Sequence, residues 1–584
     1  MSRLAILVAL LVLAGIGVPQ VPAAVEVGGV TYDHVDPGEP FTAVAQPRED
    51  WQPARATRAE GRAGLIAYWR PAPEDLRPWS RPRPEECVRK PLRTFAALGE
   101  TEPVWVAIYA RDDLTRITAR VEDLPEGVTS ELFVVHFWPQ RTSWRTRQYY
   151  ITPELLLPYD AADGYAWFPG QGVLERKSYD LPAGTTGAVW LRLKVARSAT
   201  PGTYRFRLHL QAEHHRRLTV PLELEVLPFE LRKPEKRAWL MYADIGRWEK
   251  MSDQQRWIDA KDFAAHGMDG LVSMPLGVPD LSRLKEGVVK WDVSQTRRYL
   301  ELLQQAGLRG PWVMSGGLVR KVQKALGLTV LDLKKPWPTE LKEGLKTAAR
   351  PLADLYSKLG LDWYFYGWDE PSGDNLYAIQ QYQCWKEAGA PIYVTMCRAG
   401  FWGLMAQYLD APCFSTSFVS NKVACEKTRE DCRQFGKKFW WYGSGCYIGQ
   451  EGRLFPNRYL AGILFWKTGA DAQVSWTYMR PHENPFNDFD GVKVNRVEPK
   501  DQTTVYPWLE KAGDWSTYRG PIQTIQWEAL REGIDDYCYL WTLHDLASRA
   551  AAAPNPERAR AGRRLPGLCG TSVLLCPGPQ TVAG

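Results

Sequence analysis

Hydrophobic and polar residues alternate one by one through the first part of the chain, between clusters of turn residues. Clear runs of this kind lie at 104–109, 188–195 and 218–226. Because successive side chains of a strand point to opposite faces, this period of two predicts strands with one buried face. Several such runs separated by turns are typical of an antiparallel sandwich. We therefore expect a β-sandwich domain over residues 25–235.

Near Lys233 the pattern changes to short apolar strands that alternate with helical stretches. The expected strands are 237–245, 270–275, 310–316, 362–369, 391–396, 411–417, 437–443 and 471–478. Helices are expected at 294–306, 340–359, 375–388, 422–435 and 458–468, several of them ending at a glycine, where a left-handed cap costs little. Repeated strand–helix units imply a parallel sheet, and roughly eight of them predict a closed (β/α)8 barrel over residues 236–547. An open doubly wound sheet is the alternative, but no G-x-G-x-x-G motif follows the first strand.

The two ends of the chain predict segments outside these domains. Arg3, an apolar run at 4–18 and small residues up to Ala24 are typical of a secretion signal over residues 1–24. A membrane anchor is the alternative, but the run is at the short limit for a span. We expect an exported protein, secreted or periplasmic, with no stable membrane span after cleavage. Residues 548–584 lack periodicity and are expected to form a disordered or atypical tail.

Composition narrows the possible partners. Among the 584 residues, 73 basic and 67 acidic side chains give a net charge of +6, which gives no reason to expect nucleic acid binding. The 10 cysteines include no C-x-x-C motif and no paired histidines, so no metal site and no cofactor is expected. The 26 tryptophans and 26 tyrosines suit either a large aromatic core or stacking against sugar rings, and composition alone favours the core.

The strongest candidate for catalysis is the adjacent pair Asp369 and Glu370, at the end of an aromatic strand. On the strand count this is the C-terminal end of the fourth barrel strand, where such barrels hold their active sites. Alternatively, the two carboxylates only favour the N-terminus of the following helix. Two neighbours on one chain cannot easily flank a sugar ring as acid and nucleophile. They suit substrate-assisted hydrolysis, in which one acid protonates the leaving oxygen and the other orients an attacking 2-acetamido group.

The segment 366–371 (YGWDEP) resembles the Asp-Glu motif of glycoside hydrolase family 123, whose members release β-linked N-acetylgalactosamine. Further resemblance lies in 464–471 (LFWKTGAD), 474–476 (VSW), 189–191 (VWL), 201–204 (PGTY) and 525–540 (IQWEALREGIDDYCYL). The most specific of these motifs is the run 530–537 (LREGIDDY). It covers most of the chain up to about residue 547 but not the tail. The resemblance implies an N-terminal sandwich followed by a catalytic barrel. It also implies that Glu370 is the general acid/base and that Asp369 orients the acetamido nitrogen.

Other side chains near the expected strand ends are candidates for substrate binding. These are Trp368, Tyr366, Tyr442, Trp476, Tyr478 and Asp244. Trp476 and Tyr478 are expected to share one face of the last strand, because strand side chains alternate, and with Tyr442 they can wall an acetamido pocket or simply pack in the core. Asp244 can bind a sugar hydroxyl or cap a loop. The charged residues 531–536 follow a helical pattern, which favours a structural salt-bridged helix over a catalytic role.

These features together predict a retaining exo-glycosidase that removes terminal β-linked N-acetylgalactosamine from a glycan or glycoconjugate. Two alternatives remain on the same scaffold: a glycosidase of another specificity, and a non-catalytic glycan-binding protein, because fold does not fix function.

Overall fold

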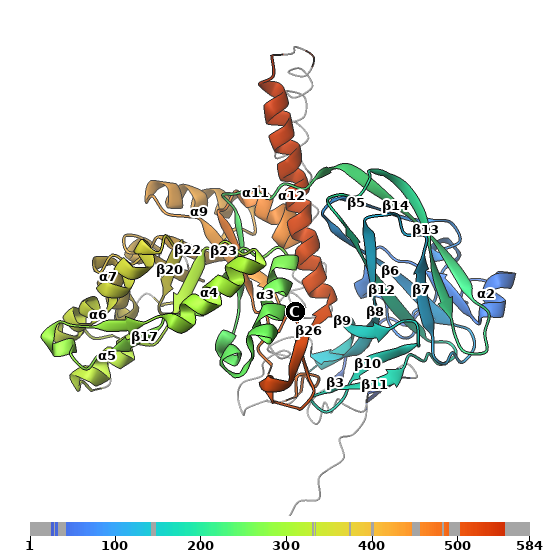
Figure 1. The fold of residues 1–584 in the computed structure, drawn as a ribbon, viewed down its shortest axis with the longest axis horizontal. Coiled ribbons are helices and arrows are strands. Elements are labelled where there is room, and N and C mark those ends of the chain that lie inside the picture. Colours follow the sequence, from blue (N-terminus) through green and yellow to red (C-terminus); the bar gives the residue numbers. More distant parts are fainter. Residues whose placement is uncertain are drawn as a thin grey trace, which may run out of the picture.

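The computed structural model contains two bodies side by side, with the long helix α12 (Ile525–Ala551) between them (Figure 1). It describes residues 25–27, 30–32, 42–141, 148–329, 332, 334–372, 375–398, 402–446, 456–481, 484–489, 503–554 and 557. The predicted signal peptide and most of the predicted tail lie outside the described residues. Within those residues, none of the helices combines the length and hydrophobicity needed to span a bilayer.

The first body is the predicted β-sandwich. Its larger sheet has the order β11 (Leu174–Ser178), β10 (Tyr165–Pro169), β9 (Gln148–Asp160), β8 (Val128–Arg141), β12 (Thr186–Val195), β6 (Thr101–Ala110) and β4 (Leu65–Tyr68). The smaller sheet has the order β5 (Leu92–Leu98), β14 (Leu218–Glu230), β13 (Gly202–Gln211) and β7 (Thr118–Glu122). Alternation explains the packing: in β13 the apolar Phe206, Leu208 and Leu210 are buried, while the intervening Arg205 and Arg207 are exposed.

Short elements lie around this sandwich. They are the hairpin β1 (Val25–Val27) and β2 (Val30–Tyr32), the strand β3 (Thr42–Ala43) beside β9, and the helix α2 (Arg58–Ala63).

The second body is a closed barrel of eight strands, all paired in parallel. In order around the barrel these are β15 (Ala238–Tyr242), β16 (Gly270–Pro275), β19 (Trp312–Ser315), β20 (Trp363–Tyr366), β21 (Ile392–Met396), β22 (Ala411–Ser415), β23 (Trp440–Gly445) and β24 (Ala472–Trp476). Every strand lies within or next to a range expected from the sequence. The predicted barrel is thus confirmed, and the open sheet is excluded because β24 pairs with β15.

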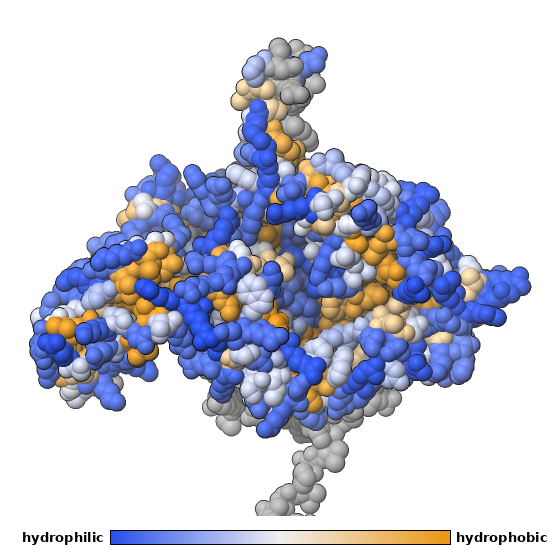
Figure 2. Space-filling view, in the orientation of Figure 1, coloured by the Kyte–Doolittle hydropathy of each residue, from blue (hydrophilic) through white to orange (hydrophobic). Residues whose placement is uncertain are grey.

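Helices and one small hairpin connect the barrel strands (Figure 1). The helices are α3 (Asp253–Ala265), α4 (Ser294–Ala306), α5 (Leu318–Leu326), α6 (Thr339–Lys358), α7 (Leu376–Glu387), α8 (Trp402–Met405), α9 (Lys422–Gln434), α10 (Pro456–Tyr459) and α11 (Phe465–Thr468), the last two joined by a π-helical turn. The hairpin consists of β17 (Val278–Asp280) and β18 (Lys290–Asp292). Most of the surface in Figure 2 is hydrophilic, with hydrophobic patches over parts of both bodies, so these helices turn mainly polar side chains outward.

Aromatic side chains fill the barrel interior. Tyr364 and Tyr366 of β20 point inward, whereas Phe365 points outward and stacks on Trp385 of α7 with ring centroids 3.7 Å apart. Tyr242, Tyr393 and other inward residues complete this inner cluster. The interior is therefore a packed core, and a ligand can be held only at an end of the barrel.

The last part of the chain returns to the sandwich. Strands β25 (Tyr506–Leu509) and β26 (Tyr518–Thr524) form a hairpin, and the end of β26 pairs with Leu155 and Leu156 of β9. Residues expected in the barrel domain, 236–547, thus supply strands to the sandwich sheet. The pattern of one short strand shows that it has a buried face, but not which sheet it joins. Helix α12 also continues past the expected limit at 547, to Ala551.

Candidate functional site

Asp369 and Glu370 follow β20 at the C-terminal rim of the barrel, and both side chains are exposed. The Tyr366 hydroxyl donates a hydrogen bond of 2.5 Å to Asp369 Oδ1, and the Thr395 hydroxyl of β21 donates to the same oxygen. Among the described residues no bond reaches the second oxygen of Asp369. The carboxylate is therefore held in one orientation while one oxygen remains available to a ligand.

Glu370 has an unusual backbone and a separate anchor. Its φ of 40° lies in the left-handed region, which non-glycine residues rarely adopt and which is often found at functional sites. Its backbone N–H donates to Thr395 Oγ1 at 3.1 Å. The Tyr442 hydroxyl of β23 donates to Glu370 Oε1. Burial and this bond to a carboxylate raise the pKa of Tyr442, so its phenol remains a donor.

A chain of tyrosine hydroxyls lies beneath the two carboxylates. The Tyr242 hydroxyl of β15 donates to the Tyr366 hydroxyl at 3.1 Å, and it lies 3.0 Å from the Tyr393 hydroxyl. Burial raises the pKa of all three phenols well above the usual value, so they remain neutral. Because Tyr366 donates onward to Asp369, this network orients that carboxylate from below.

The structure brings several predicted residues into this site. Asp369, Glu370, Tyr366 and Tyr442 are joined by the bonds above, and the half-buried Trp476 packs against Tyr242 with ring centroids 4.9 Å apart. Sequence reasoning missed Thr395, Tyr242 and Tyr393. Tyr242 and Thr395 lie in the C-terminal halves of predicted strands, so a search of these halves for hydroxyl groups would have found them, whereas Tyr393 lies near the start of its strand and has no such signal.

Three other predicted residues take no part in these hydrogen bonds. Trp368 turns outward and packs against Tyr377 of α7, with ring centroids 5.2 Å apart. Asp244 is exposed and caps the short helix Ile245–Lys250, accepting a hydrogen bond from the Gly246 N–H at 3.3 Å. The expected place of Tyr478 was wrong. Strand β24 ends at Trp476, so its alternation does not extend to residue 478.

Tyr478 instead belongs to the core outside the barrel. It is fully buried, its hydroxyl donates to Asp262 of α3 at 2.8 Å, and its ring lies 4.3 Å from that of Phe263.

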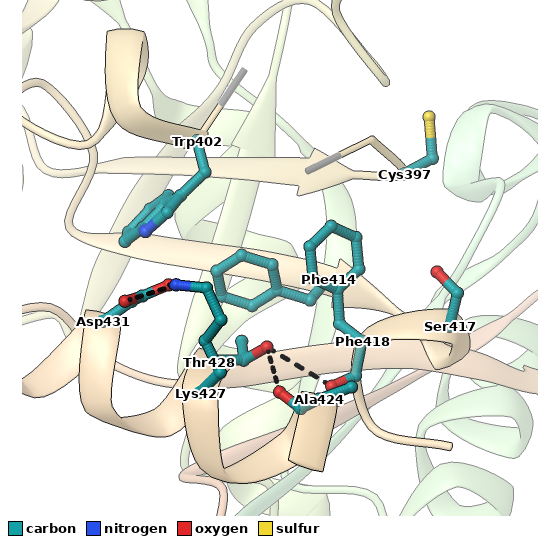
Figure 3. Close-up of a pocket in the computed structure, with 9 residues that line it drawn as sticks. All are labelled: Cys397, Trp402, Phe414, Ser417, Phe418, Ala424, Lys427, Thr428 and Asp431. Atoms are coloured by element: carbon teal, nitrogen blue, oxygen red, sulfur yellow. Dashed lines mark hydrogen bonds and ion pairs between the residues drawn. The ribbon is translucent and has the colours of Figure 1, made fainter. Parts of the chain in front are cut away.

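The carboxylates lie between two pockets of different character. The pocket in Figure 3, about 360 Å³ in volume, lies between the ends of β21 and β22 and helix α9, with Cys397 at its edge. Its walls are the rings of Trp402, Phe414 and Phe418, and the Lys427–Asp431 ion pair lies beside them. Burial raises the pKa of the Cys397 thiol, and the negative charge of Glu370 raises it further.

The second pocket, about 520 Å³ in volume, lies between the ends of β19 and β20 and is lined by Trp368 and polar residues of α5 and α7.

Within the described residues, no group of three or more His, Cys, Asp or Glu side chains is placed to hold a metal ion.

Comparison with known proteins gives one informative likeness. No protein-family model and no curated protein matches the sequence. Among solved structures, a family 123 glycoside hydrolase from Clostridium perfringens matches with a TM-score of 0.59 and 13% sequence identity, over 82% of this chain and 94% of that one. A GH5 xyloglucanase from Bacteroides ovatus covers 76% of this chain and 98% of its own at 7% identity, but its TM-score of 0.27 is too low to carry an argument. The predicted resemblance to family 123 is therefore confirmed for the fold.

Proposed function

We propose that this chain is an exported, retaining exo-glycosidase that removes terminal β-linked N-acetylgalactosamine from glycans by substrate-assisted catalysis. The observation that carries the proposal is the arrangement of the two adjacent carboxylates at the barrel rim. Asp369 is held by neutral hydroxyls through one oxygen, and Glu370 is held separately by Tyr442. The solved family 123 enzyme with this fold is described as hydrolysing glycolipid glycans, which supports a glycan substrate.

Each carboxylate has one role in this mechanism. Glu370 donates its proton to the glycosidic oxygen as that bond breaks. Asp369 accepts a hydrogen bond from the substrate acetamido N–H, and the acetamido oxygen attacks the anomeric carbon to form a cyclic oxazolinium. Glu370 then removes a proton from water as the water opens this ring, so two inversions leave the configuration retained.

The preference for an acetamido group follows from the position of Asp369. A hydrogen bond to a charged acceptor is stronger than one between neutral groups. This bond strengthens as the acetamido nitrogen becomes positive, and interactions that strengthen in the transition state accelerate the reaction. No second carboxylate is needed on the far side of the sugar.

A panel of substrates tests the proposal directly. Purified protein lacking residues 1–24 would be assayed on 4-nitrophenyl N-acetyl-β-galactosaminide, N-acetyl-β-glucosaminide and β-galactoside. We expect the first to be cleaved fastest and the β-galactoside hardly at all, because it lacks the nucleophile. Efficient cleavage of the plain galactoside would favour a glycosidase of another specificity. Binding of N-acetylgalactosamine with no cleavage of any substrate would favour a glycan-binding protein.

Glu370→Gln separates the acid role from simple binding. It should lower turnover on the order of 10² or more on natural glycans, whose leaving groups need protonation. Activated aryl substrates should suffer less, because their leaving groups depart without a proton. Unchanged turnover of natural glycans in Glu370→Gln would contradict the assigned role.

A further inference from the structure

The aromatic pocket of Figure 3 lies on the same side of β20 as the catalytic acid. Glu370 is held toward β21 by Thr395 and toward β23 by Tyr442, and the pocket lies at the ends of β21 and β22, within this sector of the rim. Cys397 connects the two, because its thiol belongs to the pocket wall and also interacts with the Glu370 carboxylate. If Glu370 protonates the glycosidic oxygen, the leaving group therefore starts beside this pocket.

Three rings make the pocket apolar. Phe414 of β22 packs edge-on against Trp402 of α8, with ring centroids 5.2 Å apart. Its centroid lies 5.1 Å from that of Phe418, at the end of the short helix Thr416–Phe418. Ala424 of α9 adds a methyl group to the opposite wall (Figure 3). The enclosed volume of about 360 Å³ has room for a group of several carbon atoms.

The polar side chains that α9 contributes already have partners. Lys427 and Asp431 form an ion pair with each other at 2.8 Å, so they add no net charge. The Thr428 hydroxyl donates to the Ala424 carbonyl at 2.8 Å. None of these side chains therefore needs a hydrogen bond from a ligand.

The other polar atoms of the pocket also provide few hydrogen bonds for a ligand. The hydroxyls of Ser417 and Ser415 lie 2.8 Å apart and bind each other. The indole nitrogen of Trp402 is buried away from the pocket surface. Hydroxyl groups of a second sugar would thus lose hydrogen bonds to water without protein partners to replace them, which is unfavourable. An apolar group has no such loss and gains from leaving water.

We propose that this pocket binds the leaving group of the substrate and favours an apolar alcohol over a second sugar. The preferred substrate is then a glycoconjugate in which the terminal N-acetylgalactosamine is joined directly to an apolar group. Glycans with a sugar at this position remain substrates, but with a lower kcat/KM. The inference rests on the proposed function, because Glu370 defines the leaving-group side only as the general acid.

A series of alkyl glycosides tests the proposal in the wild type. The N-acetyl-β-galactosaminides of methanol, butanol and hexanol would be compared with that of galactose. The three alcohols have nearly equal acidity, so differences among them report binding and not leaving-group chemistry. We expect kcat/KM to rise at least about tenfold from the methyl to the hexyl glycoside, because more apolar surface leaves water. The hexyl glycoside should also have a higher kcat/KM than the galactose glycoside.

A matched pair of leucine variants locates the preference in the pocket. Ala424 lines the pocket, whereas its neighbour Val423 is 77% exposed and does not. Leucine is a good helix former, so it suits both positions of α9. Ala424→Leu should remove most of the hexyl-over-methyl ratio of kcat/KM, because the added carbons occupy the pocket. Val423→Leu should keep this ratio.

A third variant reaches the pocket by removing a wall instead of filling the space. Phe418→Ala deletes a half-buried ring, so it should lower the hexyl-over-methyl ratio through lost contacts with the alkyl chain. Because the ratio compares two substrates of one variant, it is independent of how much of the protein is folded.

The outcomes distinguish this inference from the proposed function. If the hexyl and methyl glycosides have equal kcat/KM, if the galactose glycoside is preferred, or if Ala424→Leu keeps the wild-type ratio, the inference is wrong while the glycosidase stands. If no glycoside is cleaved, the proposed function is wrong, and calorimetric titration with the methyl and hexyl glycosides decides the inference. Tighter binding of the hexyl glycoside, lost in Ala424→Leu but kept in Val423→Leu, supports the pocket. Equal binding of the two glycosides overturns it.

Discussion

Two groups of acidic side chains in this protein have opposite surroundings. Asp369 and Glu370 are exposed at the barrel rim, are held by neutral hydroxyls, and make no ion pair with the described residues. Glu528 and Glu532 on α12 are buried and lie against arginines. The hydrogen-bonding partners of an acidic side chain therefore indicate its role. Hydroxyl groups orient a carboxylate without neutralising its charge, whereas arginines neutralise the charge and give the carboxylate a structural role.

The α12 group joins the two bodies of the molecule. Glu528 lies 2.7 Å from Arg531 and also pairs with Arg192 of the sandwich strand β12. Burial raises the pKa of Glu528, but the charges of Arg192 and Arg531 hold it well below the usual value. The most family-specific part of the sequence, around 530–537, therefore has a structural role here, as its helical charge pattern predicted.

Asp369→Asn should have the largest effect, on catalysis alone. The amide cannot stabilise the positive nitrogen of the transition state, so turnover should fall on the order of 10²–10³. The melting temperature should hardly change, because the side chain is exposed. Asp280→Asn, another exposed carboxylate on the barrel, serves as the control and should leave turnover unchanged. Loss of folding in Asp369→Asn would show that the rim carboxylates have a structural role, and it would contradict the difference drawn between them and the α12 acids.

Arg531→Met should have the converse effect, on stability alone. Removing one partner of a buried ion pair typically costs about 3–5 kcal/mol, because the other charge remains buried. Denaturant unfolding would measure this loss, and kcat of the remaining folded protein should match the wild type. A fall in kcat without a fall in stability would show that the α12 acids act in catalysis.

Glu100 combines features of the two groups, because it is buried like the α12 acids but accepts a hydrogen bond from a hydroxyl like the rim carboxylates. This buried glutamate of the sandwich accepts a hydrogen bond from Tyr539 of α12, and burial raises its pKa from the usual 4.5 to about 7. The folded state thus binds its proton more tightly than the unfolded state. Stability from this group is complete below pH 4.5 and is lost as pH rises to about 7, at up to about 3 kcal/mol. Glu100→Gln should flatten this part of the stability profile, and an unchanged profile would exclude Glu100 as its source.

Thr395→Val should give the smallest effect. It removes one donor to Asp369 and the acceptor for the Glu370 N–H, which corresponds to about a tenfold loss of turnover. Thr296→Val is a matched control, since this buried threonine of α4 donates to the Pro275 carbonyl at 3.1 Å and also interacts with the Tyr356 hydroxyl, away from Asp369 and Glu370. Equal kcat values for the two variants would mean that hydroxyl groups do not position the rim carboxylates.

The sequence predicted the barrel because each strand is a short apolar run and helices lie between the runs. The sequence also placed Asp369 and Glu370 at the C-terminal end of a barrel strand, because the end of a strand can be located from the hydrophobic pattern alone. It did not find the bonds from Thr395 and Tyr442, because these depend on which strands a closed barrel brings together. Tyr478 was misplaced for a local reason, since the strand ends two residues earlier. The pairing of β26 with β9 depends on contacts between distant segments, which periodicity does not contain.

The central claim is that Asp369 helps the substrate's own acetamido group to attack. Inhibition by N-acetylgalactosamine-thiazoline, a stable mimic of the cyclic intermediate, tests it most directly. The account predicts that the thiazoline binds wild-type protein on the order of 10² or more tighter than free N-acetylgalactosamine, as expected for a mimic of a high-energy state. This advantage should largely disappear in Asp369→Asn. Equal affinities for thiazoline and free sugar in the wild type would contradict the account.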